Sequence, residues 1–146
     1  IFNLFSKKYK VFLGDSGSTF FGFMLSLILI YFTTDKINYF HPSLVPWFIA
    51  VPIYDSLRVI IYRIIKKNNP FLPDETHLHH VLFKLNFNRY QIFIIVICLQ
   101  FILILIGYLS SQYIIPDTSI ILFPVIFILY FLIVSKLESK IKISSK

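Results

Sequence analysis

The segment IFIIVICLQFILILIGYL, residues 92–109, decides the class of fold because it is a long apolar stretch without a charged residue. A helix that crosses a lipid bilayer needs about 20 mostly apolar residues, within a range of about 17–25. Residues 92–109 reach this range by themselves. They therefore predict a transmembrane helix, and they are the clearest candidate span in the chain.

Three further apolar blocks extend this pattern, at residues 19–32, 44–65 and 119–134. Two prolines and two charged residues interrupt the second of them: Pro46, Pro52, Asp55 and Arg58. Four such blocks are hard to reconcile with the alternative, in which they are buried helices of a soluble protein. We predict an all-α polytopic membrane helix bundle with about four transmembrane helices, at residues 19–34, 44–65, 91–110 and 118–135.

The composition supports a membrane protein and argues against nucleic-acid binding. Hydrophobic residues make up 57% of the 146 residues, above the roughly 45–50% that is typical of soluble domains. The net charge is +7, but the basic residues flank apolar spans and form no patch interleaved with exposed aromatic residues. Cys98 is the only cysteine. It excludes a disulfide and a cysteine metal site, and we expect an inert buried thiol.

The basic residues indicate how the spans are oriented. If all four blocks cross the membrane, thirteen of the fourteen lysines and arginines fall on one side, and Lys36 is the exception. Positive residues favour the cytoplasm. We therefore expect both chain ends and the long loop at 63–90 to be cytoplasmic, and the loops at 35–43 and 110–118 to face outward. His41 would lie on that outer side.

The long loop contains a cluster of histidines. Asparagines and prolines end the preceding helix, and Asp74 then stands at a favourable N-cap position. Apolar residues spaced as i, i+3, i+4 and i+7 follow it: Leu78, Val81, Leu82 and Leu85. At 100° per residue, His77 and His80 fall beside this stripe with Lys84, and His79 points elsewhere. The pattern predicts a short amphipathic cytoplasmic helix at the membrane surface.

Three interpretations remain open for the histidine cluster. Its basic edge of hydrogen-bond donors suits phosphate or carboxylate ligands. Imidazole also binds metals, and zinc could be held by His77, His79 or His80 together with Asp74. Structural zinc, however, usually takes four ligands, and side chains at i and i+2 of one helix diverge. The third interpretation is a solvated turn at the membrane interface without a ligand.

The stretch GDSGS, which precedes the first apolar block, also permits two interpretations. Gly14 and Gly17 allow tight backbone geometry and close approach of a ligand. Asp15, Ser16 and Ser18 supply oxygen atoms where a helix begins, which is a common helix-capping pattern. The same position attracts phosphate, and Asp15 could hold Mg²⁺ against phosphate oxygens.

Asp55 lies inside the second apolar block, with Arg58 three residues later and Arg63 closer to the cytoplasm. Charged residues at membrane depth are costly and usually face a polar interior. One interpretation is an internal Asp55–Arg58 pair, because residues at i and i+3 are neighbours on a helix. The other places both at the wall of a cytoplasmic cleft. We expect a mixture, in which Asp55 organises the site and the arginines extend partly toward lipid headgroups.

Three motifs occur together in one known family: FLGDSGS at 12–18, PIYDSLRVIIYR at 52–63 and NPFLPDETHLHH at 69–80. In these motifs, their order and their spacing, the sequence resembles the polyprenyl-phosphate N-acetylhexosamine-1-phosphate transferases. The form HLHH is similar to the N-acetylglucosamine branch, whereas the muramoyl-pentapeptide branch typically has three consecutive histidines. The resemblance runs from Val11 to about Tyr90 and covers the later half of the family's architecture.

The resemblance implies an enzyme. It would transfer a HexNAc-1-phosphate from a UDP-sugar to undecaprenyl phosphate and release UMP, to start the synthesis of a cell-envelope polysaccharide. It would be a multi-pass protein of the bacterial plasma membrane with a cytoplasmic active site and a Mg²⁺ ion, or Mn²⁺ in its place. A homodimer is compatible with the resemblance. The identities of the UDP-sugar and of the polysaccharide stay open.

The resemblance also implies roles for individual residues. The catalytic set would be Asp15, which would bind the metal ion, and His77, His79 and His80, which would contact the sugar diphosphate. The substrate-binding positions belong to the same three motifs: Gly14, Ser16, Gly17, Ser18, Asp55, Arg58 and Asp74. This arrangement requires Asp15 and the three histidines to converge on one pocket at the inner leaflet.

Two departures from the family bear on activity. The family's aspartate-rich motifs of earlier helices are absent, and the chain starts at Ile1 without a methionine. We therefore expect residues 1–146, with a cytoplasmic loop at about 66–90, to be the C-terminal part of a single multi-spanning transferase domain and to be inactive alone. The alternative is a truncated, non-catalytic membrane module. Glu75 also stands where the family commonly has a basic residue, which argues against a phosphate contact there.

Overall fold

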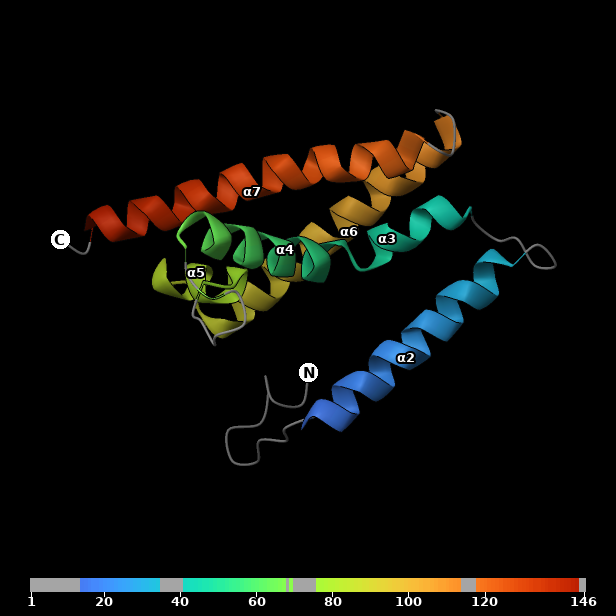
Figure 1. Ribbon diagram of the computed structural model, residues 1–146, viewed down its shortest axis with the longest axis horizontal. Coiled ribbons are helices and arrows are strands. Elements are labelled where there is room, and N and C mark those ends of the chain that lie inside the picture. Colours follow the sequence, from blue (N-terminus) through green and yellow to red (C-terminus); the bar gives the residue numbers. More distant parts are fainter. Residues whose placement is uncertain (1–13, 35–40, 68, 70–75, 114–117, 145–146) are drawn as a thin grey trace.

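The protein is helical across the residues that the structure describes. The computed structural model describes residues 14–34, 41–67, 69, 76–113 and 118–144. The helices are α2 (Gly14–Thr33), the short 3-10 helix η1 (Pro42–Leu44), α3 (Val45–Phe48), α4 (Ala50–Ile65), α5 (Leu78–Lys84), α6 (Arg89–Tyr113) and α7 (Thr118–Ser144) (Figure 1). No strand occurs within these ranges, and the predicted all-α fold is confirmed.

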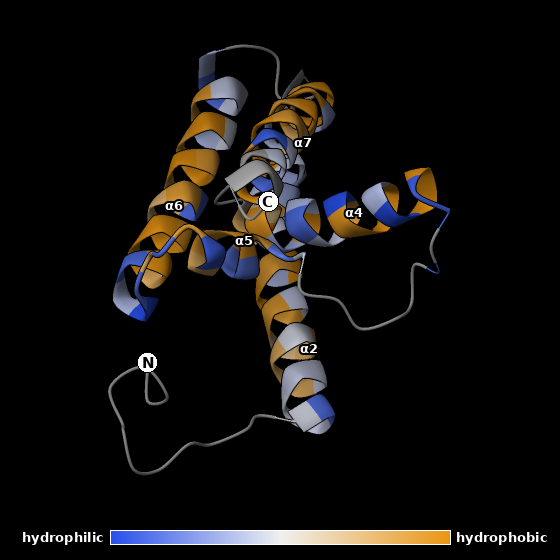
Figure 2. Cartoon of the chain, turned by 90° about the vertical axis from the view of Figure 1, so that its left-hand side faces the viewer, coloured by the Kyte–Doolittle hydropathy of each residue, from blue (hydrophilic) through white to orange (hydrophobic). Residues whose placement is uncertain are grey.

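Three helical segments are long and apolar enough to cross a membrane: Gly14–Thr33, Arg89–Tyr113 and Ser119–Ser139. The fourth candidate is a pair of segments, Pro42–Phe48 and Ala50–Ile65, between which the chain bends by 68°. The span predicted at 44–65 therefore has the expected position but is broken. Figure 2 shows that apolar residues dominate α2, α6 and α7. The predicted four spans are obtained if the bent pair counts as one.

The helix α2 begins before the span predicted at residues 19–34. Its first residue is Gly14, whose φ of +66° lies in the left-handed region that favours glycine. The hydroxyls of Ser18 and Thr19 donate to the carbonyl of Asp15, at 2.9 and 2.8 Å. The stretch GDSGS is thus the first turn of the helix, at the place where the sequence predicts that a helix begins. Leu29 is the one buried residue of α2, which extends away from the other helices (Figures 1 and 2).

The bend between α3 and α4 is held by a side chain of α6. The side-chain amide of Gln100 donates to the carbonyl of Trp47 at 2.7 Å, and its oxygen accepts from the backbone N–H of Val51 at 3.0 Å. Helix ends leave such backbone groups without a helical partner. Inside a membrane these groups need a protein partner, because no water is available. Gln100 therefore allows a broken helix to exist within an apolar bundle.

We expect the Gln100→Leu substitution to lower the free energy of unfolding by about 1–3 kcal/mol, because it removes the partner of the buried N–H of Val51 and one donor to the carbonyl of Trp47. The same substitution at Gln112, which lies exposed near the end of α6, is the matched control and should have little effect. Unfolding in mixed lipid–detergent micelles measures both variants. Equal stability of the two variants would contradict this role of Gln100.

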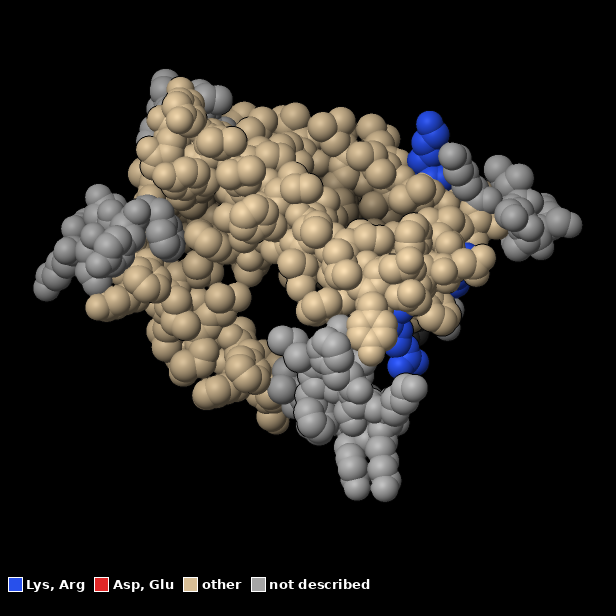
Figure 3. All heavy atoms as spheres, turned by 180° about the vertical axis from the view of Figure 1, so that it is seen from behind, with Lys and Arg blue, Asp and Glu red and all other residues tan. Residues whose placement is uncertain are grey.

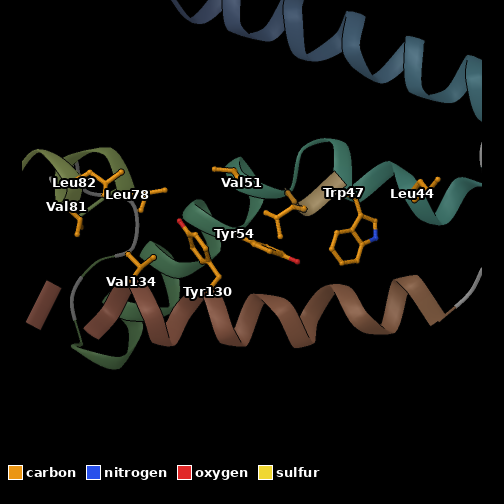
Figure 4. Packing of buried hydrophobic residues seen from close by; sticks show 11 residues of the cluster. Leu44, Trp47, Val51, Tyr54, Leu78, Val81, Leu82, Tyr130 and Val134 are labelled. Atoms are coloured by element: carbon orange, nitrogen blue, oxygen red, sulfur yellow. The ribbon is translucent and has the colours of Figure 1, made fainter. Parts of the chain in front are cut away.

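A core of aromatic side chains joins α3 and α4 to α7 (Figure 4). The centroid of the Tyr54 ring lies 4.7 Å from that of Phe123 and 5.6 Å from that of Tyr130. The hydroxyl of Tyr54 donates to the carbonyl of Phe123 at 2.7 Å. Trp47 is fully buried, and its indole N–H donates to the hydroxyl of Ser119 at 3.3 Å. These contacts fix α4 against α7 and decide which residues of α4 face the last helix.

Cys98 lies exposed on α6, and the expectation of a buried thiol is wrong. Its neighbours Ile97, Phe101 and Ile102 are exposed as well, so the apolar run does not face the protein on all sides. A helix that is apolar around its whole circumference is typical of a membrane span. Composition alone does not distinguish the side that faces other helices from the side that faces lipid.

Basic side chains, shown in blue in Figure 3, lie toward one end of the molecule. The C-terminal ends of α4 and α7, the short α5 and the start of α6 lie at this end (Figure 1). The lysines and arginines whose side chains the structure describes belong to these helices and the residues next to them: Arg58, Arg63, Lys66, Lys67, Lys84, Arg89 and Lys136. The arrangement agrees with the shared side that the charge pattern predicts. That this side is cytoplasmic stays a prediction.

Candidate active site

The carboxylate of Asp55 is the point at which three helices meet. Asp55 lies on the second turn of α4, and its side chain is 15% exposed. Its Oδ1 accepts from the backbone N–H of Leu78 at 2.8 Å, and its Oδ2 lies 3.0 Å from Nδ1 of His77. The hydroxyl of Tyr130 on α7 donates to Oδ1 at 3.4 Å. The expectation that Asp55 organises its surroundings therefore has a clear structural basis.

The contact with Asp55 fixes the orientation of the His77 ring. An ionised carboxylate only accepts hydrogen bonds, so Nδ1 of His77 must carry the hydrogen in this contact. The other ring nitrogen, Nε2, is then left for a ligand. A carboxylate that orients an imidazole in this way is a common support of functional histidines. The His77 side chain is 37% exposed, which leaves the ring accessible.

The three histidine rings lie side by side. The ring of His79 is 5.9 Å from that of His77, in a stacked orientation, and 4.2 Å from that of His80. His77 is the residue before α5, and its ψ of 152° is not helical. The helical angle of 100° per residue does not apply across it. The prediction that the helix begins at Asp74 is therefore wrong, because α5 begins at Leu78. The prediction that His79 points away from the other two rings is also wrong, since its ring lies beside both.

The short helix α5 has the predicted amphipathic character. Leu78, Val81 and Leu82 are buried, whereas His79 and Phe83 are exposed. The apolar side packs into the core beside α6 and α7. This packing holds the start of α5, and with it the histidines, against the end of the bundle. Asp74, which was expected to bind substrate, lies outside the described residues, as does Glu75.

Arg58 connects α4 to the histidine-bearing segment and to α7. Its side chain is fully buried, and Nη2 donates to the carbonyl of Thr76. Nη1 lies 3.5 Å from Oε2 of Glu138, and Nη2 lies 3.6 Å from Oδ1 of Asp55. The expected Asp55–Arg58 pair is therefore present, as part of a larger network.

The expectation that the arginines extend toward lipid headgroups is wrong, because Arg58 and Arg63 are both buried. Burial of a charge is tolerated where opposite charges and hydrogen bonds compensate for lost water. Glu138 supplies such a charge from α7, eighty residues after Arg58 in the numbering. The sequence did contain one signal for it: Glu138 is the only acidic residue between 118 and 146.

The pKa of His79 is lowered from its ordinary value of 6.5. The main cause is partial desolvation of the ring, although the side chain lies at the surface; positive charge on His80 and His77 adds to the shift, and Asp55 opposes it. His79 is therefore mostly neutral at pH 7. Because the folded state binds the proton less readily than the unfolded state, the free energy of unfolding falls as the pH drops below 6.5.

Histidine NMR titration tests this cluster. We expect the His80→Asn substitution to raise the pKa of His79 partway toward 6.5, because one positive neighbour is removed while the desolvation remains. The His41→Asn substitution is the control, since His41 contacts Ser43 and belongs to another part of the chain. A His79 pKa that is identical in the wild type and the His80→Asn variant would contradict the electrostatic contact.

The residues of the first motif occupy a separate part of the molecule. Gly14, Asp15, Ser16 and Ser18 are exposed and Gly17 is partly buried. The start of α2 lies apart from α5 in both ribbon views (Figures 1 and 2). In the part of the chain that the structure describes, no three His, Cys, Asp or Glu side chains are grouped so as to hold a metal ion. The convergence of Asp15 with the histidines stays a prediction.

Comparison with known proteins gives a consistent set of relatives. Over 130 residues, the chain is 35% identical to the undecaprenyl-phosphate alpha-N-acetylglucosaminyl 1-phosphate transferase of Haemophilus influenzae. The aligned residues make up 89% of the chain and 36% of the relative. Proteins of the same name from Escherichia coli K12 and Yersinia pestis are 33% identical over 129 residues, 87% of the chain and 35% of each relative. The chain thus spans about a third of their length.

Two other comparisons return nothing. No family model matches the sequence. No solved structure matches it either.

Proposed function

Because the chain is homologous over most of its length to undecaprenyl-phosphate alpha-N-acetylglucosaminyl 1-phosphate transferases, as its motifs indicated, we propose that it forms part of such an enzyme. The enzyme transfers N-acetylglucosamine-1-phosphate from UDP-N-acetylglucosamine to undecaprenyl phosphate and releases UMP. This reaction starts the assembly of a cell-envelope polysaccharide at the inner face of the bacterial plasma membrane. The observation that carries the proposal is the group of three adjacent histidine rings, of which that of His77 is held by Asp55.

The chemistry of the site suits two phosphate-bearing substrates. A nucleotide-sugar diphosphate and a lipid phosphate repel each other, so the site must supply hydrogen bonds and positive charge before they react. His77 can present Nε2, and His79, mostly neutral at pH 7, can take up a proton as a diphosphate approaches. Lys84 and Arg89 lie at the same end of the bundle. The residues thus favour binding of a phosphate dianion over binding of a neutral ligand.

The donor set at the start of α2 suits Mg²⁺. Asp15 offers an exposed carboxylate, and Ser16 and Ser18 offer hydroxyl oxygens in the first turn of a helix. Mg²⁺ usually binds one or two carboxylates together with waters and substrate phosphates. Asp15 would hold the ion, and Mn²⁺ could replace it. When bound, the metal would neutralise charge on the phosphate oxygens.

A doubly labelled donor tests the reaction type. The donor is UDP-N-acetylglucosamine with ³H in the sugar and ³²P at the β-phosphorus. In phosphosugar transfer, a lipid phosphate oxygen attacks the β-phosphorus and the bond to the α-phosphate breaks. Both labels then enter the lipid in equal amounts, and UMP is released. Transfer of the sugar alone would instead leave ³²P in UDP.

The assay uses a chimera in which this chain replaces the matching segment of a curated relative. We expect lipid carrying both labels from the chimera, and none from the variant with alanine at His77, His79 and His80 or from the chain alone. A chimera that folds, as judged by a sharp size-exclusion profile, and yet forms no labelled lipid would contradict the proposal. It would favour the alternative of a non-catalytic membrane module, to which the separation of α2 from α5 lends support.

A further inference from the structure

Glu138 is a buried acid that the proposed reaction does not yet use. It lies near the C-terminal end of α7 and is 8% exposed. Its Oε1 accepts from the hydroxyl of Tyr62 at 2.8 Å, and its Oε2 lies 3.5 Å from Nη1 of Arg58. Both partners belong to α4, so this carboxylate joins the last helix to the helix that carries Asp55.

Arg58 passes this connection on to the histidine-bearing segment. It donates through Nη2 to the carbonyl of Thr76, the residue immediately before His77. A single guanidinium therefore lies between Glu138 of α7 and the backbone that leads into the histidines. The guanidinium is planar and its donors are fixed relative to one another. If Nη1 moves relative to Glu138, Nη2 therefore moves relative to the carbonyl of Thr76 as well.

We propose that Glu138 is a positioning residue for the phosphosugar site, which acts through Arg58 to keep the His77 ring on Asp55 with Nε2 directed to the ligand. The inference rests on the proposed function. It assigns the last helix a part in the site, although none of the three sequence motifs extends into α7.

The physical basis is competition for the carboxylate of Asp55. Arg58 lies between two acids, 3.5 Å from Glu138 and 3.6 Å from Asp55. With Glu138 in place, the guanidinium charge is shared, and Asp55 can accept from His77 and Leu78. Without that charge, the buried guanidinium is left with one carboxylate and moves closer to it. Nη2 of Arg58 faces Oδ1, the oxygen that accepts from the N–H of Leu78, so its approach competes with that N–H. The carboxylate then turns, and Oδ2 moves away from Nδ1 of His77.

The first test is ¹⁵N NMR of the histidine rings in the full chain, embedded in lipid nanodiscs. In the wild type we expect His77 as a single tautomer with hydrogen on Nδ1. The Glu138→Gln substitution keeps the side-chain volume and removes the charge, so we expect a mixture of Nδ1–H and Nε2–H forms. Lys136→Gln, an exposed change of charge on the same helix, is the matched control and should leave the spectrum unchanged.

A weaker second variant covers the case in which Glu138→Gln fails to fold. Tyr62→Phe removes only the hydroxyl that holds Glu138. It should shift the His77 tautomers in the same direction by a smaller amount. An unchanged His77 tautomer in folded Glu138→Gln, or in folded Tyr62→Phe when the former does not fold, would overturn the inference.

The second test is transfer activity in the chimera. We expect Glu138→Gln to lower kcat about 10–100-fold, as for other residues that orient a functional side chain, with little change in KM for the nucleotide-sugar. In a His77→Asn background the same substitution should have no further effect on kcat. Independent, multiplicative losses would show that Glu138 does not act through His77 and would overturn the inference.

These two tests separate the inference from the proposed function. A folded wild-type chimera without transfer contradicts the proposed function, whatever the tautomer of His77. Normal wild-type transfer with unchanged kcat in Glu138→Gln contradicts the positioning role alone.

Discussion

Replacing Arg58 by leucine is expected to lower the free energy of unfolding by about 3–5 kcal/mol. The guanidinium is fully buried between Asp55 and Glu138, and it also donates to the carbonyl of Thr76. Its loss leaves two carboxylates near each other in a water-poor environment, and one carbonyl loses its donor. Denaturation in mixed lipid–detergent micelles measures the change.

The double variant Arg58→Leu/Glu138→Leu is the decisive control. Replacing both members of a buried ion pair by apolar residues is often neutral, whereas removing one member is costly. We therefore expect the double variant to regain at least half of the lost stability but not the transfer activity of the chimera. A double variant less stable than Arg58→Leu would show that Arg58 and Glu138 do not form a compensating pair.

Substitution of Gly107 by valine should destabilise the bundle by about 3 kcal/mol, the upper part of the usual range for overpacking. A Cβ at Gly107 would lie 2.3 Å from Cγ of the Trp47 ring. Trp47 cannot move away easily, because it is fully buried, bonded to Ser119 and packed on Phe123. Glycine is needed there because it lets α3 and α6 approach closely, as small residues do between membrane helices.

Gly22 provides a matched control within the same chain. It is also helical, but a Cβ there would meet nothing within 4 Å. We expect Gly22→Ala to be neutral or slightly stabilising, since alanine favours a helix by about 1 kcal/mol over glycine. The Gly107→Ala substitution should be destabilising in the same assay. Equal effects at the two positions would contradict the close contact with Trp47.

Much of the fold follows from the sequence because apolar length is a direct requirement of the bilayer. Residues 92–109 predicted a span, and α6 contains them all. The bend between α3 and α4 could not be predicted, because it depends on Gln100, which is distant from Trp47 and Val51 along the chain. The two prolines at 46 and 52 indicated an interruption but not its angle.

The site was predicted in part for a similar reason. Asp55 and His77 were recognised from local motifs, yet their contact joins residues 22 positions apart. Arg58 was expected to extend toward headgroups because its partner Glu138 lies on another helix and could not be recognised from local spacing. The predicted helix included His77, but His77 has a non-helical ψ, so its direction relative to His79 and His80 could not be derived from helical periodicity. Long-range partners of charged residues cannot be read from local spacing.

The most direct test of the account is whether a metal ion bound with the donor lies close to both Asp15 and the histidines. The full chain, labelled with ¹⁵N at histidine, is titrated with Mn²⁺ in the presence of UDP-N-acetylglucosamine. We predict paramagnetic broadening of His77, His79 and His80 but not of His41, and its loss in Asp15→Asn. Broadening that is absent, that affects His41 equally, or that persists in Asp15→Asn would contradict a shared phosphosugar site.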